Sequence, residues 1–192
     1  MGRHIKVMVG FTGSRACDRR LRELLDCGYL ERKKIIYGIP SLYFLTGKGK
    51  TLIGKKAKSD NIRIDKITHE ITVLDTVCYL MRNQNIKLND IVTERQLFSE
   101  NGFNTRKHYP DLIFKADGIT TCVEIELSVK DRSRFEKNLQ DNFMTYDKQI
   151  WVVPKTGYKI RQYLSDYKDT YPNIEILDLE EINNDDEFGK SD

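Results

Sequence analysis

The chain has 192 residues, of which 32 are Lys or Arg and 29 are Asp or Glu, so its formal net charge is only +3. Hydrophobic residues make up 39% of the chain and aromatic residues 10%, which is enough for one compact domain or two small ones and excludes an intrinsically disordered protein. No apolar run approaches the roughly 20 residues of a membrane span, and the N-terminus lacks a signal-peptide core, so we expect a cytoplasmic protein. The four cysteines form no CxxC pair, which indicates reduced thiols rather than disulfides or zinc ligands.

Charge is divided unevenly along the chain. Residues 1–60 contain 14 basic and 5 acidic residues, whereas residues 61–192 contain 18 basic and 24 acidic ones. A basic module followed by an acidic one indicates that the first module contacts a polyanion. With a boundary between Lys55 and Asn61, we predict a basic module over 1–58, a second domain over 61–179 and an acidic, mobile tail over 180–192.

The basic module contains a predicted amphipathic helix. Ser14 is a suitable N-cap and Gly28 a stop signal, and the apolar residues between them fall on one side of the helix. Arg15, Arg19 and Arg22 share the opposite side, where they either lie in solvent or contact DNA.

Two strand-like runs follow this helix. Residues 29–37 and 41–45 are joined by the turn-forming sequence Gly38-Ile39-Pro40, and the first run is basic. A helix sized for the major groove, followed by a two-stranded wing whose cations meet phosphates, is the geometry of winged helix-turn-helix DNA binding. The predicted contacts to double-stranded DNA are Arg15, Arg19, Arg22, Arg32, Lys33 and Lys34.

The segment RRLRELLDCGYLERKKIIYGIPSLYFLTGKGKTLI, residues 19–53, resembles the winged-helix module of bacterial plasmid replication-relaxation proteins. In that module a helix ending in Gly and a YLER-like strand lead to LTxxGxxL, and here Thr46 is the predicted N-cap of the last short helix. The chain departs from the pattern because only residues 5–10 precede the first helix, which leaves little room for the usual additional helix. We therefore expect a module truncated at its start, or another element that covers Leu21 and Leu24.

The acidic module is predicted to form a mixed sheet flanked by helices, in the order αβββαβ followed by a further helix and strand. The expected helices cover residues 68–82, 130–142 and 157–166. The expected strands cover residues 91–98, 111–116, 119–128, 149–153 and 174–179.

Acidic residues gather on one face of a predicted hairpin. Asp117-Gly118 is a strong signal for a type I′ turn, which places Asp111 opposite Glu124, with Glu126 on the same side of the strand. Directly opposed side chains lie about 5 Å apart, where two carboxylates repel each other unless a cation separates them. Carboxylate oxygens are the ligands that Mg²⁺ and Mn²⁺ prefer, so these acids predict a metal site; the alternative is an acidic face in water.

A third acid, Glu70, lies in the helix expected over 68–82. Its spacing from Leu74, Val77 and Met81 places it on the apolar stripe of the helix and directs it toward the sheet. A favourable interaction with the helix dipole is the alternative explanation for an acid in this first turn.

The sequence Tyr109-Pro110-Asp111, followed after twelve residues by Glu124-Ile125-Glu126, resembles the PD-(D/E)xK nuclease signature, and Glu70 matches the helical acid of many members. The layout also resembles the replication-relaxation family and the MobC-type relaxases of mobilisable plasmids. This resemblance implies a restriction-endonuclease-like αβββαβ domain that nicks plasmid origin DNA with a divalent metal. Relaxosome proteins or a second copy of the chain are the further partners that it implies.

The lysine of the nuclease signature is replaced here by Glu126, and Lys130 or Lys137 is the candidate replacement on the next helix. In the enzymatic hypothesis Asp111 and Glu124 hold Mg²⁺ or Mn²⁺, and the other site residues orient water or a second ion. The alternative is a non-catalytic DNA-binding protein, either a relaxosome accessory factor or a transcriptional regulator, with a degenerate nuclease fold. The proposed catalytic residues are Glu70, Asp111, Glu124, Glu126 and Lys130.

Two histidines lie close in sequence to the proposed acids. His69 precedes Glu70, and His108 lies two residues before Pro110. We expect such histidines to be hydrogen-bonded neighbours of the acids rather than metal ligands.

Overall fold

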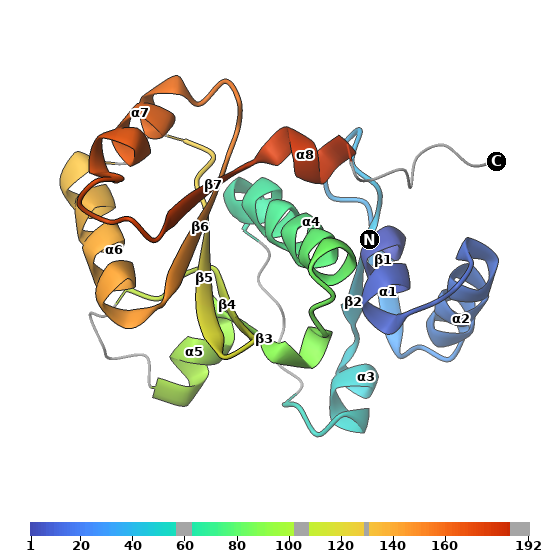
Figure 1. Cartoon of the computed structure of the whole chain (residues 1–192). Coiled ribbons are helices and arrows are strands. Elements are labelled where there is room, and N and C mark those ends of the chain that lie inside the picture. Colours follow the sequence, from blue (N-terminus) through green and yellow to red (C-terminus); the bar gives the residue numbers. More distant parts are fainter. Residues whose placement is uncertain (57–62, 102–107, 129–130, 185–192) are drawn as a thin grey trace. The chain divides into compact units, whose positions relative to one another are not determined.

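The computed structural model describes residues 1–56, 63–101, 108–128 and 131–184. The chain is a mixed α/β protein that divides into two compact units, residues 1–70 and 71–192 (Figure 1). The linker expected between Lys55 and Asn61 falls mostly outside the described residues, so the predicted domain limits stay predictions.

Two helices joined by a tight turn open the first unit. The first, α1 (Gly2–Val9), ends at Gly10, whose φ of 77° suits a left-handed C-cap. The second, α2 (Ser14–Asp26), begins after Gly13, so Ser14 is its first residue and not its N-cap. The expectation that little room exists for a preceding helix is wrong, because the eight residues of α1 form one.

The short helix α1 covers the apolar side of α2. Leu21 is 3% exposed, and the Sγ of Cys17 lies 3.8 Å from the carbonyl oxygen of Gly2. Packing against α2 gives a short helix the burial that it needs, because an isolated helix of eight residues is unstable in water.

A hairpin and a short helix complete the first unit. Strands β1 (Leu30–Lys33) and β2 (Leu42–Leu45) pair antiparallel, and α3 (Gly47–Leu52) follows. Thr46 is the N-cap of α3 as predicted, since its Oγ1 accepts a hydrogen bond of 3.1 Å from the backbone N–H of Gly49.

The second unit is built on a five-stranded mixed sheet. Its strands, in sheet order, are β3 (Ile91–Thr93), β4 (Leu112–Ala116), β5 (Ile119–Ile125), β6 (Lys148–Val153) and β7 (Ile174–Asp178). The first three strands pair antiparallel, and β5, β6 and β7 pair parallel. The helices are α4 (Ile67–Asn83), α5 (Glu94–Asn101), α6 (Arg132–Thr145), α7 (Tyr158–Tyr167) and α8 (Leu179–Asn184). Two 3₁₀ turns, Ile64–Lys66 and Leu88–Asp90, precede α4 and β3.

Helices cover both faces of this sheet (Figure 1), with α6 and α7 on one side and α4 on the other. Trp151 and Val153 of β6 share a buried cluster with Phe135 of α6 and Leu164 of α7. The central strands therefore have no water-facing side, which decides the surroundings of the acids on β5.

Two segments differ from the sequence predictions. The strand expected over 91–98 stops at Thr93 and gives way to α5, because the Gln96 Oε1 accepts hydrogen bonds of 2.8 Å from the backbone N–H and Oγ1 of Thr93. This pairing is one half of a capping box, a helix-start signal that outweighs the local strand propensity. The tail expected to begin at 180 is instead helical in α8, where Ile182 is fully buried.

Candidate functional site

The turn at Asp117-Gly118 sets the register of the central hairpin. Both residues have positive φ, 50° and 81°, as a type I′ turn requires. Leu112 pairs with Val123, which confirms the predicted register and brings Asp111 and Glu124 to the next facing positions.

The acids of β5 point into the protein. Glu124 is 4% exposed and Glu126 is 2% exposed. Glu124 pairs in register with Trp151, so its side chain points to the face of the sheet that α6 and α7 cover. The alternative of an acidic face in water is therefore wrong for this hairpin.

Glu124 accepts two hydrogen bonds on the same oxygen. Its Oε1 lies 2.5 Å from the Nε2 of His108 and 2.9 Å from the Nδ2 of Asn142 on α6. The expectation for His108 is confirmed in this respect, because the ring is a hydrogen-bonded neighbour of an acid. A buried carboxylate needs such donors, since an unpaired buried charge would cost several kcal/mol.

Asp111 is held in a different way. Its Oδ2 accepts a hydrogen bond of 2.7 Å from the backbone N–H of Ile125, and its carbonyl oxygen accepts one of 2.9 Å from the backbone N–H of Glu94. The side chain thus joins the start of β4 to the end of β5, beside the position of Glu124. The strand register places Asp111 and Glu124 at facing positions, and each carboxylate is bonded to donors of the protein itself.

The negative charge of Glu124 contributes to the raised pKa of two neighbouring groups, the thiol of Cys122 and the phenol of Tyr146. Burial, and secondarily the charge of Glu124, raises the pKa of the Cys122 thiol well above its usual range. Burial also raises the pKa of Tyr146 to about 12, with smaller contributions from Cys122, Glu124 and Tyr109. Both groups therefore stay neutral at physiological pH.

The fit to a metal ion depends on the number of ligands that converge. Within the ranges that the structure describes, no group of three or more His, Cys, Asp or Glu side chains is arranged to hold a metal ion. Asp111 and Glu124 supply two hard oxygen donors, and water and substrate phosphates complete many Mg²⁺ sites. Binding of Mg²⁺ or Mn²⁺ by Asp111 and Glu124 stays a prediction.

The other predicted catalytic residues do not join this pair in the way expected. Glu70 is exposed, so the prediction that it lies on the buried stripe of its helix is wrong. Lys130 lies outside the described residues, and Lys137 is exposed on α6. Glu126 is buried after the end of β5, where its backbone N–H donates to the carbonyl oxygen of Val152.

Asp75 and Asn142 are among the buried polar residues that were not predicted from the sequence. Asp75 is 6% exposed in α4, so the buried acid of that helix lies five positions after Glu70. A single Asp inside the apolar run TVLDTVCYLM was the available signal. Asn142 falls at helical spacing from Phe135 and Leu139 on the buried stripe of α6, a place where an amide requires a polar partner.

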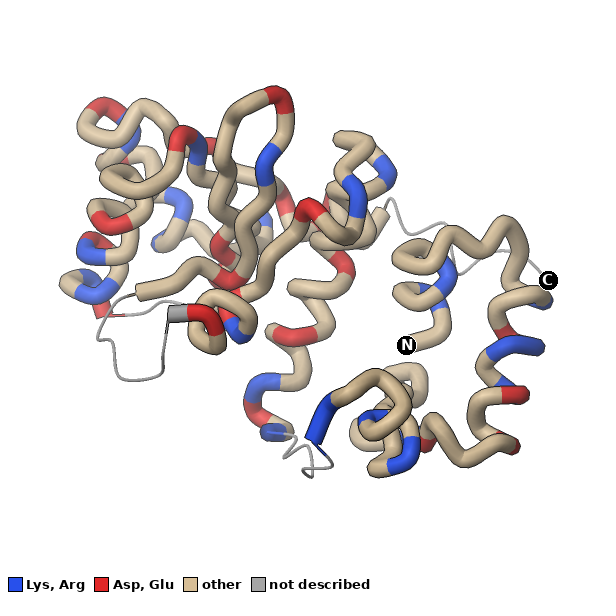
Figure 2. The backbone as a smooth tube through the Cα atoms, turned by 90° about the horizontal axis from the view of Figure 1, so that it is seen from below, with Lys and Arg blue, Asp and Glu red and all other residues tan. Residues whose placement is uncertain are grey.

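The predicted DNA contacts are all exposed in the first unit. Basic and acidic positions both occur along α2 (Figure 2). Arg15, Arg19 and Arg22 are exposed. Lys33 forms an ion pair of 2.7 Å with Glu31 in β1. The described surface therefore leaves these side chains accessible to a polyanion.

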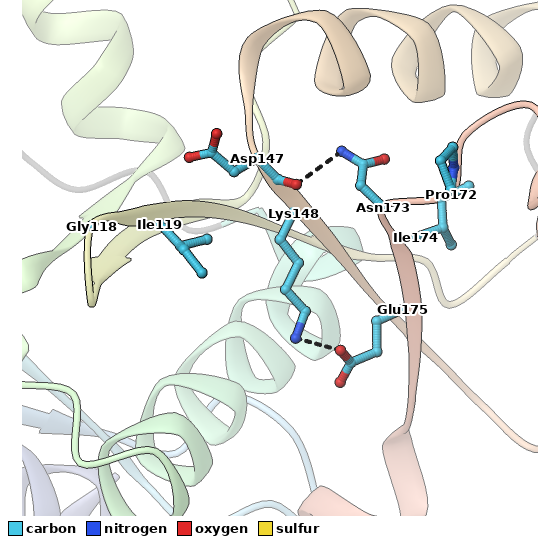
Figure 3. A pocket seen from close by; sticks show the side chains of 8 residues that line it. All are labelled: Gly118, Ile119, Asp147, Lys148, Pro172, Asn173, Ile174 and Glu175. Carbon is cyan, nitrogen blue, oxygen red and sulfur yellow. Dashed lines mark hydrogen bonds and ion pairs between the residues drawn. The ribbon is translucent and has the colours of Figure 1, made fainter.

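A pocket lies at the turn end of the β4–β5 hairpin, the end away from Asp111. Figure 3 shows the residues that line it. It has a volume of about 460 Å³ and is bordered by the β4–β5 turn and by the starts of β6 and β7. Lys148 and Glu175 form an ion pair within it, and the Nδ2 of Asn173 donates to the carbonyl oxygen of Asp147 at 3.4 Å. Lys148 and Glu175 compensate each other's charge, and the lining residues of the pocket are separate from Asp111 and Glu124.

No helix among the described residues combines the length and the apolar character needed to cross a bilayer. Comparisons with protein-family models, with curated proteins and with solved structures found no match to this chain.

Proposed function

We propose that the chain is a double-stranded DNA-binding protein whose first unit docks α2 in the major groove and the β1–β2 hairpin against the neighbouring backbone. The observation that carries this proposal is the division of α2 into two sides. Its apolar side, with Cys17 and Leu21, is buried, whereas its arginine side is exposed. Helix, turn, helix and hairpin follow one another in the order of a winged helix-turn-helix.

The charge of the first unit supports the same partner. Residues 1–60 carry an excess of nine positive charges, and contacts between such cations and phosphates supply most of the affinity of sequence-independent DNA binding. The resemblance of residues 19–53 to a plasmid replication-relaxation module makes plasmid origin DNA the first target to test.

Fluorescence anisotropy with a labelled duplex tests this proposal. The double variant Arg19→Ala, Arg22→Ala should bind more weakly and show a smaller salt dependence, by about 0.9 in the log–log slope for each phosphate that is no longer neutralised. The matched control is Arg134→Ala, Lys159→Ala, which removes the same charge from exposed positions of α6 and α7. Equal affinity of wild type and the α2 variant at every salt concentration would overturn the assignment.

A second candidate function is metal-dependent strand cleavage by the second unit. It is favoured by the facing register positions of Asp111 and Glu124 at one end of a hairpin whose strands are followed by a parallel strand, the order expected of a restriction-endonuclease-like domain. A divalent ion held by these two carboxylates would polarise a phosphate oxygen and lower the pKa of a bound water. Glu126 is near in sequence, and Lys130 is the candidate for the missing lysine.

A nicking assay on supercoiled plasmid separates the two functions. With Mg²⁺ or Mn²⁺, the wild type should convert plasmid carrying the cognate origin to open circles, and Asp111→Asn and Glu124→Gln should abolish the conversion. Asp141→Asn, on α6, is the control. Calorimetric titration with Mn²⁺ provides a second readout. Nicking that persists in both site variants would eliminate the proposed site, and a wild type that neither nicks nor binds Mn²⁺ would leave the DNA-binding function alone.

A further inference from the structure

The turn between β1 and β2 is apolar although it is exposed. Residues 35–40 read Ile-Ile-Tyr-Gly-Ile-Pro, and Tyr37 at their centre is 94% exposed. Loops on a protein surface are usually polar. Burial of a large aromatic ring is favourable, so a ring that stays exposed to water contributes none of this free energy to folding. A ring in this position is therefore available to a partner.

This tip has a defined backbone conformation. The backbone N–H of Ile39 donates to the carbonyl oxygen of Ile36 at 3.4 Å, and Gly38 has a φ of 80°. A positive φ at the third residue is the feature of a type II turn, which places Tyr37 at the second position. The antiparallel pairing of β1 with β2 holds the two ends of the turn together. This pairing reduces the conformational entropy that the turn loses when Tyr37 binds a partner.

A cation accompanies the exposed ring. The Nζ of Lys34 lies 5.3 Å from the centroid of Tyr37, within the range of a cation–π interaction. Arg32, on the same strand, is exposed as well. An aromatic ring flanked by cations at the end of a narrow hairpin matches a groove in which stacked bases lie between two rows of phosphates.

We propose that Tyr37 is a wedge that enters the minor groove of duplex DNA and partly unstacks one base step, while Lys34 contacts an adjacent phosphate. This inference rests on the proposed DNA-binding function of the first unit. Duplex DNA is favoured over a lipid surface because the same unit exposes the arginine side of α2, whose helix length suits the major groove. The hairpin reaches the neighbouring minor groove in this arrangement, as apolar wedges of architectural proteins do.

Duplexes that carry 2-aminopurine at successive positions provide the test, because the fluorescence of this base rises when it is unstacked. Binding of the wild type should raise the fluorescence at one step, and Tyr37→Ala should abolish the rise and weaken binding about tenfold. Tyr37→Phe should retain both properties because it keeps the ring. The control Tyr158→Ala removes a ring that is 78% exposed in the second unit and should leave both unchanged.

The outcomes separate this inference from the function on which it rests. A wild type that does not bind duplex DNA overturns both. A wild type that binds DNA through Arg19 and Arg22, together with a Tyr37→Ala variant that matches it in affinity and fluorescence, overturns only the wedge. Vesicles of phosphatidylserine and phosphatidylcholine form the last arm, and Tyr37-dependent binding to them without a fluorescence change on DNA assigns the tip to a membrane surface and overturns the inference.

Discussion

The carboxylate of Asp111 accepts a hydrogen bond of 2.7 Å from the backbone N–H of Ile125, across the open end of the β4–β5 hairpin. A residue proposed to bind metal thus also satisfies a main-chain donor at the last position of β5. Because an unsatisfied donor is costly in a protein interior, this bond gives Asp111 a structural role whatever the chemistry of the site.

Replacing Asp111 is therefore expected to lower stability as well as any activity. Asp111→Ala should decrease the free energy of unfolding by about 1–3 kcal/mol, because Ile125 loses its acceptor. Asp111→Asn should cost less, since the amide oxygen still accepts the bond. Urea unfolding followed by circular dichroism measures the difference, with the exposed Asp169→Asn as the control. Equal stability of the Ala and Asn variants would show that the bond contributes nothing.

Glu124 is expected to be more sensitive than Asp111, because it is 4% exposed and bonded to both His108 and Asn142. Glu124→Ala should decrease the free energy of unfolding by about 3–5 kcal/mol, since it opens a cavity and leaves the buried Asn142 donor and the half-buried His108 without an acceptor. Glu124→Gln preserves the volume and one acceptor oxygen and should cost markedly less in the same urea experiment. A Gln variant as unstable as the Ala variant would show that the charge, and not the hydrogen bonds, maintains the site.

The register of the acidic hairpin could be read from the sequence because it depends on local chemistry. Asp117 and Gly118 are among the few residues that adopt positive φ readily, and once the turn is placed, the period of two in a strand fixes which side chains face each other. The mixed α/β class could also be predicted, because segments with helical periodicity alternate along the chain with segments of strand periodicity. The winged-helix and nuclease-like arrangements stay predictions.

Two helices that were not predicted, α1 and α5, depend on tertiary packing and on a helix-capping hydrogen bond, respectively. The helix α1 has only eight residues and gains its stability by covering Leu21, a tertiary contact that a short segment does not reveal. The spacing of Thr93 and Gln96 indicates the start of α5. The prediction instead followed the strand-like sequence before Thr93 and extended that strand too far. Glu70 was misplaced because its helix is buried around much of its circumference, so a single apolar stripe does not define the inward side.

Gly49 is expected to be irreplaceable in the first unit. A Cβ at this position would lie 2.2 Å from the carbonyl oxygen of Tyr29, so any side chain must push α3 away from the chain that leads into β1. Gly49→Ala should decrease the free energy of unfolding by about 1–3 kcal/mol, in spite of the higher helix propensity of Ala. Thermal unfolding compared with Gly2→Ala, whose added Cβ would meet an ordinary contact of 3.7 Å, isolates the clash. A Gly49→Ala variant as stable as Gly2→Ala would contradict this packing.

Tyr146 is expected to make the stability of the second unit depend on alkaline pH. Burial raises its pKa to about 12, from an ordinary value of about 10. Between these values the unfolded chain loses the phenolic proton while the folded chain retains it, so the folded state binds more protons and the free energy of unfolding falls as pH rises from 10 to 12. Below pH 10 the stabilising contribution of the neutral phenol is fully present.

The variant Tyr146→Phe removes this titration and should show a shallower decrease in the free energy of unfolding over the same pH range. Urea unfolding at several pH values from 9 to 12 provides the measurement, and Tyr158→Phe, at an exposed position of α7, controls for the removal of an ordinary phenol. The Cys122 thiol, whose pKa is also raised by burial, is present in wild type and in both variants. Parallel pH profiles for wild type and Tyr146→Phe would mean that Tyr146 ionises as freely in the folded protein as in the unfolded chain.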